Sequence, residues 1–112
     1  MRAPRRGDLV RVDFDPRLGH EQSGHRPALV LSNSRYNKAS GMIVACPITS
    51  KVKGYPLEVA LPAGLETVGV VLAHQVRALD WRARNARVIE PAPADLVEEV
   101  LDILVTLLEG DA

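Results

Sequence analysis

Short apolar runs, broken by Gly, Pro and Asn, fill the first 90 residues of this 112-residue chain. Residues 8–14 alternate between apolar and polar side chains, which is the period of two expected of a β-strand with one buried face. Similar runs predict further strands at 27–32, 42–48, 57–61, 69–73 and 76–81. The runs at 27–32 and 42–48 are almost continuously apolar, so we expect these two strands to be central and buried on both faces. This pattern predicts a small antiparallel β-barrel or sandwich.

Polar segments connect the predicted strands. Residues 15–24 contain one Pro and two Gly and predict a mobile loop, while residues 49–56 predict a second loop with a basic centre. Residues 33–41 predict one or two helical turns that Gly41 ends.

The last 20 residues change to a helical pattern, with Pro93 suited to the first turn and Gly110 at the exit. The polar side chains form only one narrow stripe on this helix, and the other nine between 96 and 108 are apolar. One small barrel cannot cover so wide an apolar surface, so the helix predicts a partner subunit and therefore a homodimer.

Length and composition indicate one soluble domain over residues 1–112, with 46% hydrophobic and 25% charged residues. No run of 18 apolar residues and no signal peptide are evident, so we expect a cytoplasmic protein without a membrane segment. Cys46 is the single cysteine, which excludes an internal disulfide. The three histidines have no metal-ligand spacing with each other or with Cys46, so no metal or cofactor is expected.

The net charge of zero conceals an asymmetry between the two halves. Residues 1–56 carry ten Lys or Arg against four acids, and the second half carries four against ten. A surface for a polyanion such as RNA would therefore belong to the first half.

Two polar side chains at strand ends could form a site. If the strands at 27–32 and 42–48 are antiparallel neighbours, Arg26 and Thr49 share one edge of the barrel. A guanidinium forms paired hydrogen bonds with phosphate oxygens, and a hydroxyl donates a hydrogen bond to a developing oxyanion, so the pair suits phosphate chemistry. From spacing alone, two ordinary surface residues explain the pattern better than a site does.

Several segments, in order along nearly the whole chain, resemble the MazF/PemK toxin endoribonucleases. They are Gly7–Val10, Asp13–Pro16, Gly19–Ser32, Pro47–Ser50, Lys53–Val59, Gln75–Arg77 and Trp81–Arg84. The resemblance implies an SH3-like barrel with a C-terminal helix, of the type shared by MazF, PemK and CcdB proteins. It also implies a homodimer that cleaves single-stranded RNA at short sequences without a metal, and a cognate MazE-like antitoxin.

The resemblance further implies roles for individual residues. Arg26 and Thr49 match the catalytic arginine and threonine of the family, and Glu21 matches its loop glutamate. The implied reaction is attack of a ribose 2'-hydroxyl on the adjacent phosphate, which leaves a 2',3'-cyclic phosphate and a 5'-hydroxyl. Arg26 would stabilise the phosphorane charge and shuttle a proton, and Thr49 would donate to a non-bridging oxygen. The general base stays open, because arginine is a poor base.

We interpret seven further residues as candidate RNA contacts, namely Arg11, His25, Ser50, Lys51, Lys53, Gln75 and Arg84. Arg11 stands where many relatives carry an aromatic residue, and His74 stands where an acidic one is usual. These two departures bear on which RNA sequence is cut. We expect Tyr55 to be packed by its Gly and Pro neighbours, Trp81 to lie in the core or an interface, and Cys46 to be a core residue.

Two other functions remain as alternatives. One is a non-enzymatic gyrase poison of the CcdB type, which acts through C-terminal aromatic residues that this chain lacks. The other is a plain SH3-like binding module, in which Arg26 and Thr49 would be incidental.

Overall fold

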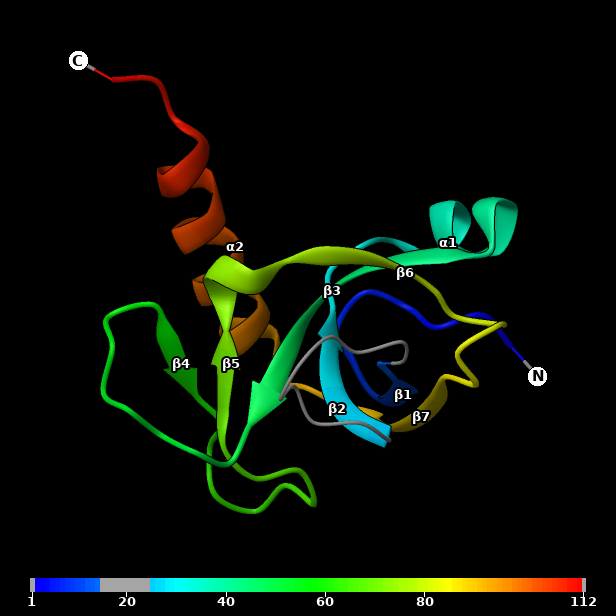
Figure 1. Ribbon diagram of the computed structural model, residues 1–112, viewed down its shortest axis with the longest axis horizontal. Helices are drawn as coiled ribbons and strands as arrows, with labels where there is room; N and C mark the ends of the chain where they lie inside the picture. Colours follow the sequence, from blue (N-terminus) through cyan, green and yellow to red (C-terminus); the bar gives the residue numbers. More distant parts are fainter. Residues whose placement is uncertain (1, 15–24, 112) are drawn as a thin grey trace.

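Antiparallel strands form most of the fold, and one long helix follows them (Figure 1). The structure is a computed structural model that describes residues 2–14 and 25–111. Its strands are β1 (Asp8–Asp13), β2 (His25–Val30), β3 (Met42–Thr49), β4 (Glu58–Ala60), β5 (Val70–Leu72), β6 (Arg77–Asp80) and β7 (Arg87–Pro91). Its helices are α1 (Ser34–Ser40), the short 3-10 helix η1 (Ala73–Gln75) and α2 (Ala94–Leu108).

Strand β3 organises the sheet because it pairs with three others. The strand order is β4-β5-β3-β2-β1-β7, and β6 also pairs with β3. Ala45 faces Val30 of β2 on one edge of β3 and Arg77 of β6 on the other, while the end of β3 pairs with β5. All these pairs are antiparallel, which confirms the predicted fold class. Within the described residues no pairing joins β4 to β7, so the predicted barrel is not closed by backbone hydrogen bonds.

Strands β1, β2 and β3 have both of their faces in the interior, because alternate side chains enter two different cores. Leu9, Leu29 and Cys46 belong to a core that α2, β4 and β5 cover. Val10, Val30 and Ala45, which point the other way, belong to a second core under β6 and the turn that follows it. The prediction for β2 and β3 is therefore mostly correct. It is wrong at five positions of the two predicted runs, which are only half buried: Pro27, Ser32, Met42, Val44 and Pro47.

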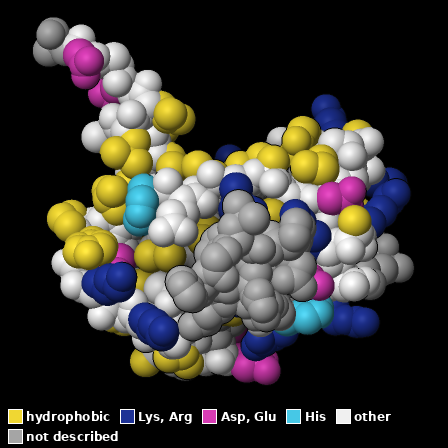
Figure 2. Space-filling view, viewed as in Figure 1, with side chains coloured by type: hydrophobic (Ala, Val, Ile, Leu, Met, Phe, Trp, Pro, Cys, Tyr) yellow, Lys and Arg dark blue, Asp and Glu magenta, His cyan; other side chains and the backbone are white. Residues whose placement is uncertain are grey.

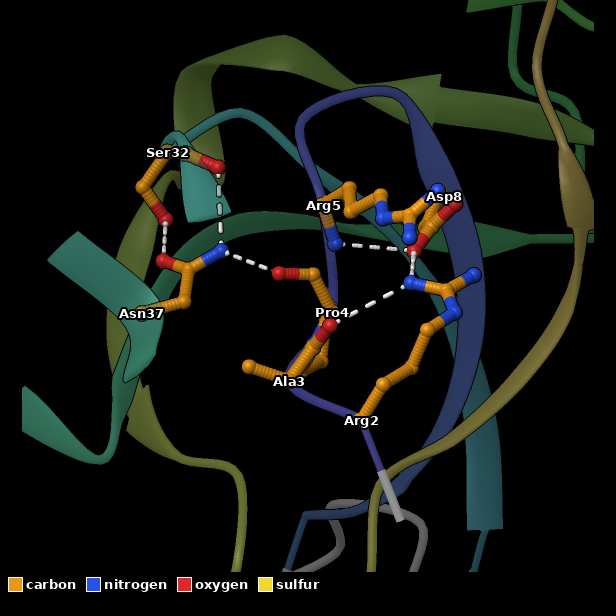
Figure 3. Close-up of polar contacts among 7 residues, drawn as sticks. All are labelled: Arg2, Ala3, Pro4, Arg5, Asp8, Ser32 and Asn37. Atoms are coloured by element: carbon orange, nitrogen blue, oxygen red, sulfur yellow. Dashed lines mark hydrogen bonds and ion pairs between the residues drawn. The ribbon is translucent and has the colours of Figure 1, made fainter. Parts of the chain in front are cut away.

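The N-terminal segment is fixed to α1 by polar contacts (Figure 3). Asn37 is fully buried, and its side-chain amide donates to the carbonyls of Pro4 (2.8 Å) and Ser32 (3.0 Å). The Trp81 indole donates to the Asn37 carbonyl at 2.8 Å. Asp8 accepts from Arg2 (3.0 Å) and from the backbone of Arg5 (2.8 Å). Buried polar groups need such partners, so this network is what permits Asn37 in the core.

Helix α1 ends at Gly41, as its sequence predicts. The Asn33 side chain accepts a hydrogen bond from the Tyr36 backbone at the N-terminus, and Gly41 takes a left-handed φ of 73° at the C-terminus. Only glycine adopts that conformation without cost, which is why the helix ends there.

Helix α2 packs on the sheet from its start as far as Leu104. Leu96, Val97 and Val100 are buried, and Leu101, Ile103 and Leu104 pack partly against the same core. The end of the helix projects beyond the sheet (Figures 1 and 2). Val105, Leu107 and Leu108 in this last turn are exposed. Pro93 is the N-cap rather than part of the first turn, and the helix ends at Leu108, two residues before Gly110.

The predicted strands lie within two residues of the observed ones, but β7 was missed altogether. The β-branched pair Val88–Ile89 is its only strand-like signal, and Pro91 ends it. The predicted mobile loop at 15–24 lies outside the described residues. No helix in residues 2–14 and 25–111 is long and apolar enough to cross a membrane.

Candidate active site

A cavity of about 300 Å³ opens where β2 begins and β3 ends. Figure 1 shows these two strand ends at the same edge of the molecule, opposite α1. The residues that line the cavity are His25, Arg26, Pro27, Ile48, Thr49, Ser50, Lys51 and Val68.

Strand pairing brings Arg26 and Thr49 to this cavity. Ala28 of β2 faces Pro47 of β3 in an antiparallel register. Continuing this register by two residues in opposite directions places Arg26 opposite Thr49, and both residues line the cavity. Residues two apart in a strand share a face, so both side chains lie on the face of Ala28 and Pro47. Both are half buried, which leaves them open to a ligand from solvent.

The Thr49 hydroxyl is oriented by the loop that follows it. Its oxygen accepts a hydrogen bond from the Lys51 backbone at 3.1 Å. A hydroxyl that accepts one bond still has its own hydrogen to donate. Thr49 can therefore donate to an oxyanion in the cavity while its oxygen is held in place.

His25, Ser50 and Lys51 surround this pair with exposed polar groups. Arg26 and Lys51 supply two cationic groups in one cavity, and none of its lining residues is acidic. Such a lining suits an anionic ligand such as a phosphate. Among the described residues no three His, Cys, Asp or Glu side chains gather closely enough to hold a metal ion.

Four of the other predicted residues do not line the cavity. Arg11 is exposed on β1 and pairs with Pro27, which does line it. Arg84 is half buried and donates to the Asp13 carbonyl at 3.2 Å, so it joins the turn after β6 to the end of β1. Lys53 and Gln75 are exposed, on the loop after β3 and on η1. Glu21 lies outside the described residues.

Sequence reasoning missed Val68 as a wall of the cavity. This residue follows Thr67 in the loop between β4 and β5, and its side chain is 72% exposed. No motif singles it out, because only the pairing of β5 with β3 brings the loop to Thr49. Tyr55 is a second difference. We expected it to be packed, but it is 56% exposed, since its loop extends away from both cores.

Two carboxylates hold the loops that flank the cavity. Glu58 accepts from the backbone of Lys53 and, at 2.8 Å, from that of Gly54. Glu90 accepts from the backbone of Glu66 and from Thr67. Hydrogen bonds to the charged form, chiefly from the Glu66 backbone, lower the pKa of Glu90.

Cys46 takes no part in this site. It is fully buried inside β3, as the sequence predicted, and burial raises the pKa of its thiol to about 12. A buried thiol that stays protonated is a poor nucleophile. Trp81 is likewise a core residue, with 4% of its surface exposed.

Comparison with known proteins gives one consistent result. Residues 5–108 match the family model described as PemK-like, MazF-like toxin of type II toxin-antitoxin system. The Escherichia coli K12 endoribonuclease toxin MazF is 47% identical over 105 residues, covering 91% of this chain and 94% of that protein. The E. coli K12 endoribonuclease toxin ChpB is 43% identical and covers 93% of each.

Solved structures agree with these sequence matches. The crystal structure of a MazE-MazF complex (Form-II) from Deinococcus radiodurans superposes with a TM-score of 0.90 at 53% identity, covering 96% of this chain and 97% of that one. The crystal structure of MazF (Form-I) from the same organism gives the same TM-score and identity.

Proposed function

Because this chain belongs to the PemK-like, MazF-like toxins of type II toxin-antitoxin systems, we propose that it is an endoribonuclease that cleaves single-stranded RNA. The observation that carries the proposal is the convergence of Arg26 and Thr49 on one cavity with a cationic lining. The relatives named above are endoribonucleases, which favours this function over a gyrase poison or a plain binding module.

The cavity supports cleavage by the ribose itself. The 2'-oxygen of one nucleotide attacks the adjacent phosphorus, and the bond from phosphorus to the 5'-oxygen breaks. The 2'-hydroxyl loses its proton and the leaving 5'-oxygen gains one, so the products are a 2',3'-cyclic phosphate and a 5'-hydroxyl. DNA lacks the 2'-hydroxyl and is not a substrate.

Arg26 and Thr49 stabilise the transition state. The charge that develops on the phosphorane oxygens is offset by the Arg26 guanidinium, which forms paired hydrogen bonds with phosphate. Thr49 donates its hydroxyl hydrogen to a non-bridging oxygen. Arg26 is the first candidate for proton transfer and Glu21 and His25 are the alternatives, and the reaction needs no metal or cofactor.

The other RNA contacts follow from charge and position. Lys51 lies in the cavity and meets a phosphate, and His25 and Ser50 contact the same nucleotides. Arg11, Lys53, Gln75 and Arg84 extend the contact surface beyond the cavity. Replacing Lys51 by alanine should reduce the slope of log affinity against log salt by about 0.7, the value for one phosphate contact on a single strand.

Two partners complete the proposal. A MazE-like antitoxin neutralises the chain, and an acidic, disordered tail would cover the cationic cavity in place of RNA. A second copy of the chain covers the exposed apolar end of α2 and gives a homodimer. The toxin meets its RNA in the cytoplasm.

The test is cleavage of a long mixed-sequence RNA by the purified protein in EDTA. We expect cuts whose 5'-products end in a 2',3'-cyclic phosphate, with a DNA of matching sequence left intact. Cleavage that stops in EDTA and returns with magnesium would overturn the metal-independent mechanism. Intact RNA together with trapped gyrase-DNA complexes would favour the gyrase poison, and RNA left intact without such complexes would favour a binding module.

A further inference from the structure

The loop between β4 and β5, residues 61–69, forms one wall of the cavity through Val68. Pro27 and Ile48 also line the cavity, but Ile48 is 2% exposed and Pro27 is half buried. Val68 is the lining residue that presents a large apolar surface, with 72% of it exposed. When a ligand covers a solvent-exposed apolar side chain in a polar cavity, apolar surface is removed from water, and this favours binding of the ligand.

Strand β7 fixes this loop from one side. The Glu90 carboxylate accepts hydrogen bonds from the Glu66 backbone (3.0 Å), the Thr67 backbone (2.8 Å) and the Thr67 hydroxyl (2.8 Å). Thr67 is only 7% exposed, whereas Glu90 is half buried and its bond from the Glu66 backbone is open to solvent. Three bonds to one carboxylate restrain both the position and the orientation of Thr67, the residue before Val68.

Strand β3 fixes the loop from the other side. Gly69 has a φ of 127° and approaches Thr49 so closely that a Cβ built on it would overlap the Thr49 carbonyl oxygen. Its own carbonyl accepts from the Leu61 backbone at 3.0 Å, and Val70 pairs with Thr49. Val68 therefore lies between two fixed residues, Thr67 and Gly69, beside the Thr49 end of β3.

We propose that Val68 is a specificity-determining residue that contacts a nucleobase next to the cleaved phosphate, and that Glu90 is a positioning residue that acts on Val68 through Thr67. This inference rests on the proposed RNA cleavage. Arg26 and Lys51 in the same cavity carry the charges that bind phosphate, so the apolar side chain is left to meet the apolar face of a base. The gap between Val68 and Thr49 then decides which bases fit, because base selection on single-stranded RNA depends on the shape of the pocket.

The experiment compares cut-site profiles on a mixed-sequence RNA for the parent, Val68→Ala, Glu90→Ala and the double variant. The kcat and KM of each protein are also measured on a short RNA that the parent prefers. Glu66→Ala is the matched control, because it removes a carboxylate from the same loop while the Glu66 backbone still donates to Glu90. Thermal melting of every variant establishes that it is folded at the assay temperature.

We expect Val68→Ala to lower kcat/KM on the preferred RNA by roughly tenfold, the scale of one lost apolar contact, and to relax the preference at one base position. Glu90→Ala should relax the preference at the same position although it has no contact with RNA. The double variant should match the single ones, because two changes that act through one contact do not add. The Glu66→Ala control should keep the profile of the parent.

A second pair of variants keeps the test decisive if Glu90→Ala does not fold. Thr67→Val removes the hydroxyl bond to Glu90 and should relax the preference, while Thr67→Ser keeps the hydroxyl and should restore the parent profile. An unchanged profile for Val68→Ala, or a uniform loss of rate at all sites for Glu90→Ala and Thr67→Val, would overturn the inference. A parent that cuts no RNA contradicts the proposed function itself, and this inference fails with it.

Discussion

Replacing Gly69 by alanine tests how strongly Thr49 depends on the loop beside it. The φ of 127° at Gly69 belongs to a region that side chains rarely adopt. A Cβ at this position would also lie 2.8 Å from the Thr49 carbonyl carbon and 3.2 Å from the Ser50 Cα. These neighbours are backbone atoms of β3 and the residue after it, so no flexible side chain can move aside.

The expected cost has two parts. An unfavourable backbone conformation costs of order 1–3 kcal/mol. Overpacking against rigid neighbours adds typically 1–3 kcal/mol. The free energy of unfolding should therefore fall by about 2–6 kcal/mol, which at about 4 °C per kcal/mol lowers Tm by roughly 8–24 °C for a domain of this size.

The same substitution should impair catalysis through Thr49. Carbon atoms in contact lie about 3.5–4.0 Å apart, so the Thr49 backbone must shift by roughly 1 Å. A misplacement of that size can lower the rate about 10²-fold.

Gly64→Ala is the matched control for this prediction. Gly64 lies in the same loop with a φ of 96°, but a Cβ there would have nothing within 4 Å. The free energy of unfolding of this variant should fall only by the cost of the backbone conformation, about 1–3 kcal/mol, and its kcat should equal that of the parent.

The assay is thermal melting by circular dichroism, followed by single-turnover cleavage of a short RNA at a temperature where each variant is fully folded. Gly69→Ala should be less stable and much slower than Gly64→Ala. Equal melting temperatures, or a folded Gly69→Ala that cuts at the parent rate, would refute the reasoning that the loop and Thr49 are in rigid contact.

Three further predictions follow from the geometry. Arg26→Ala and Thr49→Ala should each slow cleavage by about 10²-fold or more with little change in Tm, and a folded variant that cuts normally would exclude that residue from catalysis. Leu108→Glu should give a folded monomer in equilibrium sedimentation, because Leu108 is 83% exposed. Leu101→Glu should unfold the chain, because Leu101 packs on the core. A Leu108→Glu variant that still sediments as a dimer would contradict the proposed interface. The pKa of Glu90 lies below its ordinary value of 4.5, so its stabilisation is complete above about pH 4.5 and is lost as the pH falls through the lower folded pKa. Melting curves across this acid range should therefore depend less on pH for Glu90→Gln than for the parent.

The positions of most strands were predictable because their signal is local. Alternation at residues 8–14 and the continuous runs that became β2 and β3 follow directly from which face of each strand meets water. The signal that ends α1 at Gly41 is equally local. Strand β7 was missed because its five residues, Arg87–Pro91, are mostly exposed or half buried and carry little apolar pattern.

The candidate site was predictable only in part. The spacing of Arg26 and Thr49 permitted a shared edge once β2 and β3 were taken as antiparallel neighbours, and the resemblance to a toxin family gave that edge a function. Neither the spacing nor the resemblance predicted that the loop of Val68 lines the cavity. The position of this loop depends on long-range contacts with Glu90 and Thr49.

The sequence by itself determined the class of fold, the two-sided burial of the central strands and the excess of apolar surface on the last helix. These properties depend on the hydrophobic pattern of neighbouring residues, which the chain carries locally. Only the tertiary structure decided that α2 packs on the sheet as far as Leu104 and exposes its last turn, and which loop meets the cavity. Those outcomes depend on the register of β5 against β3 and on one carboxylate in β7, which join residues far apart in the chain.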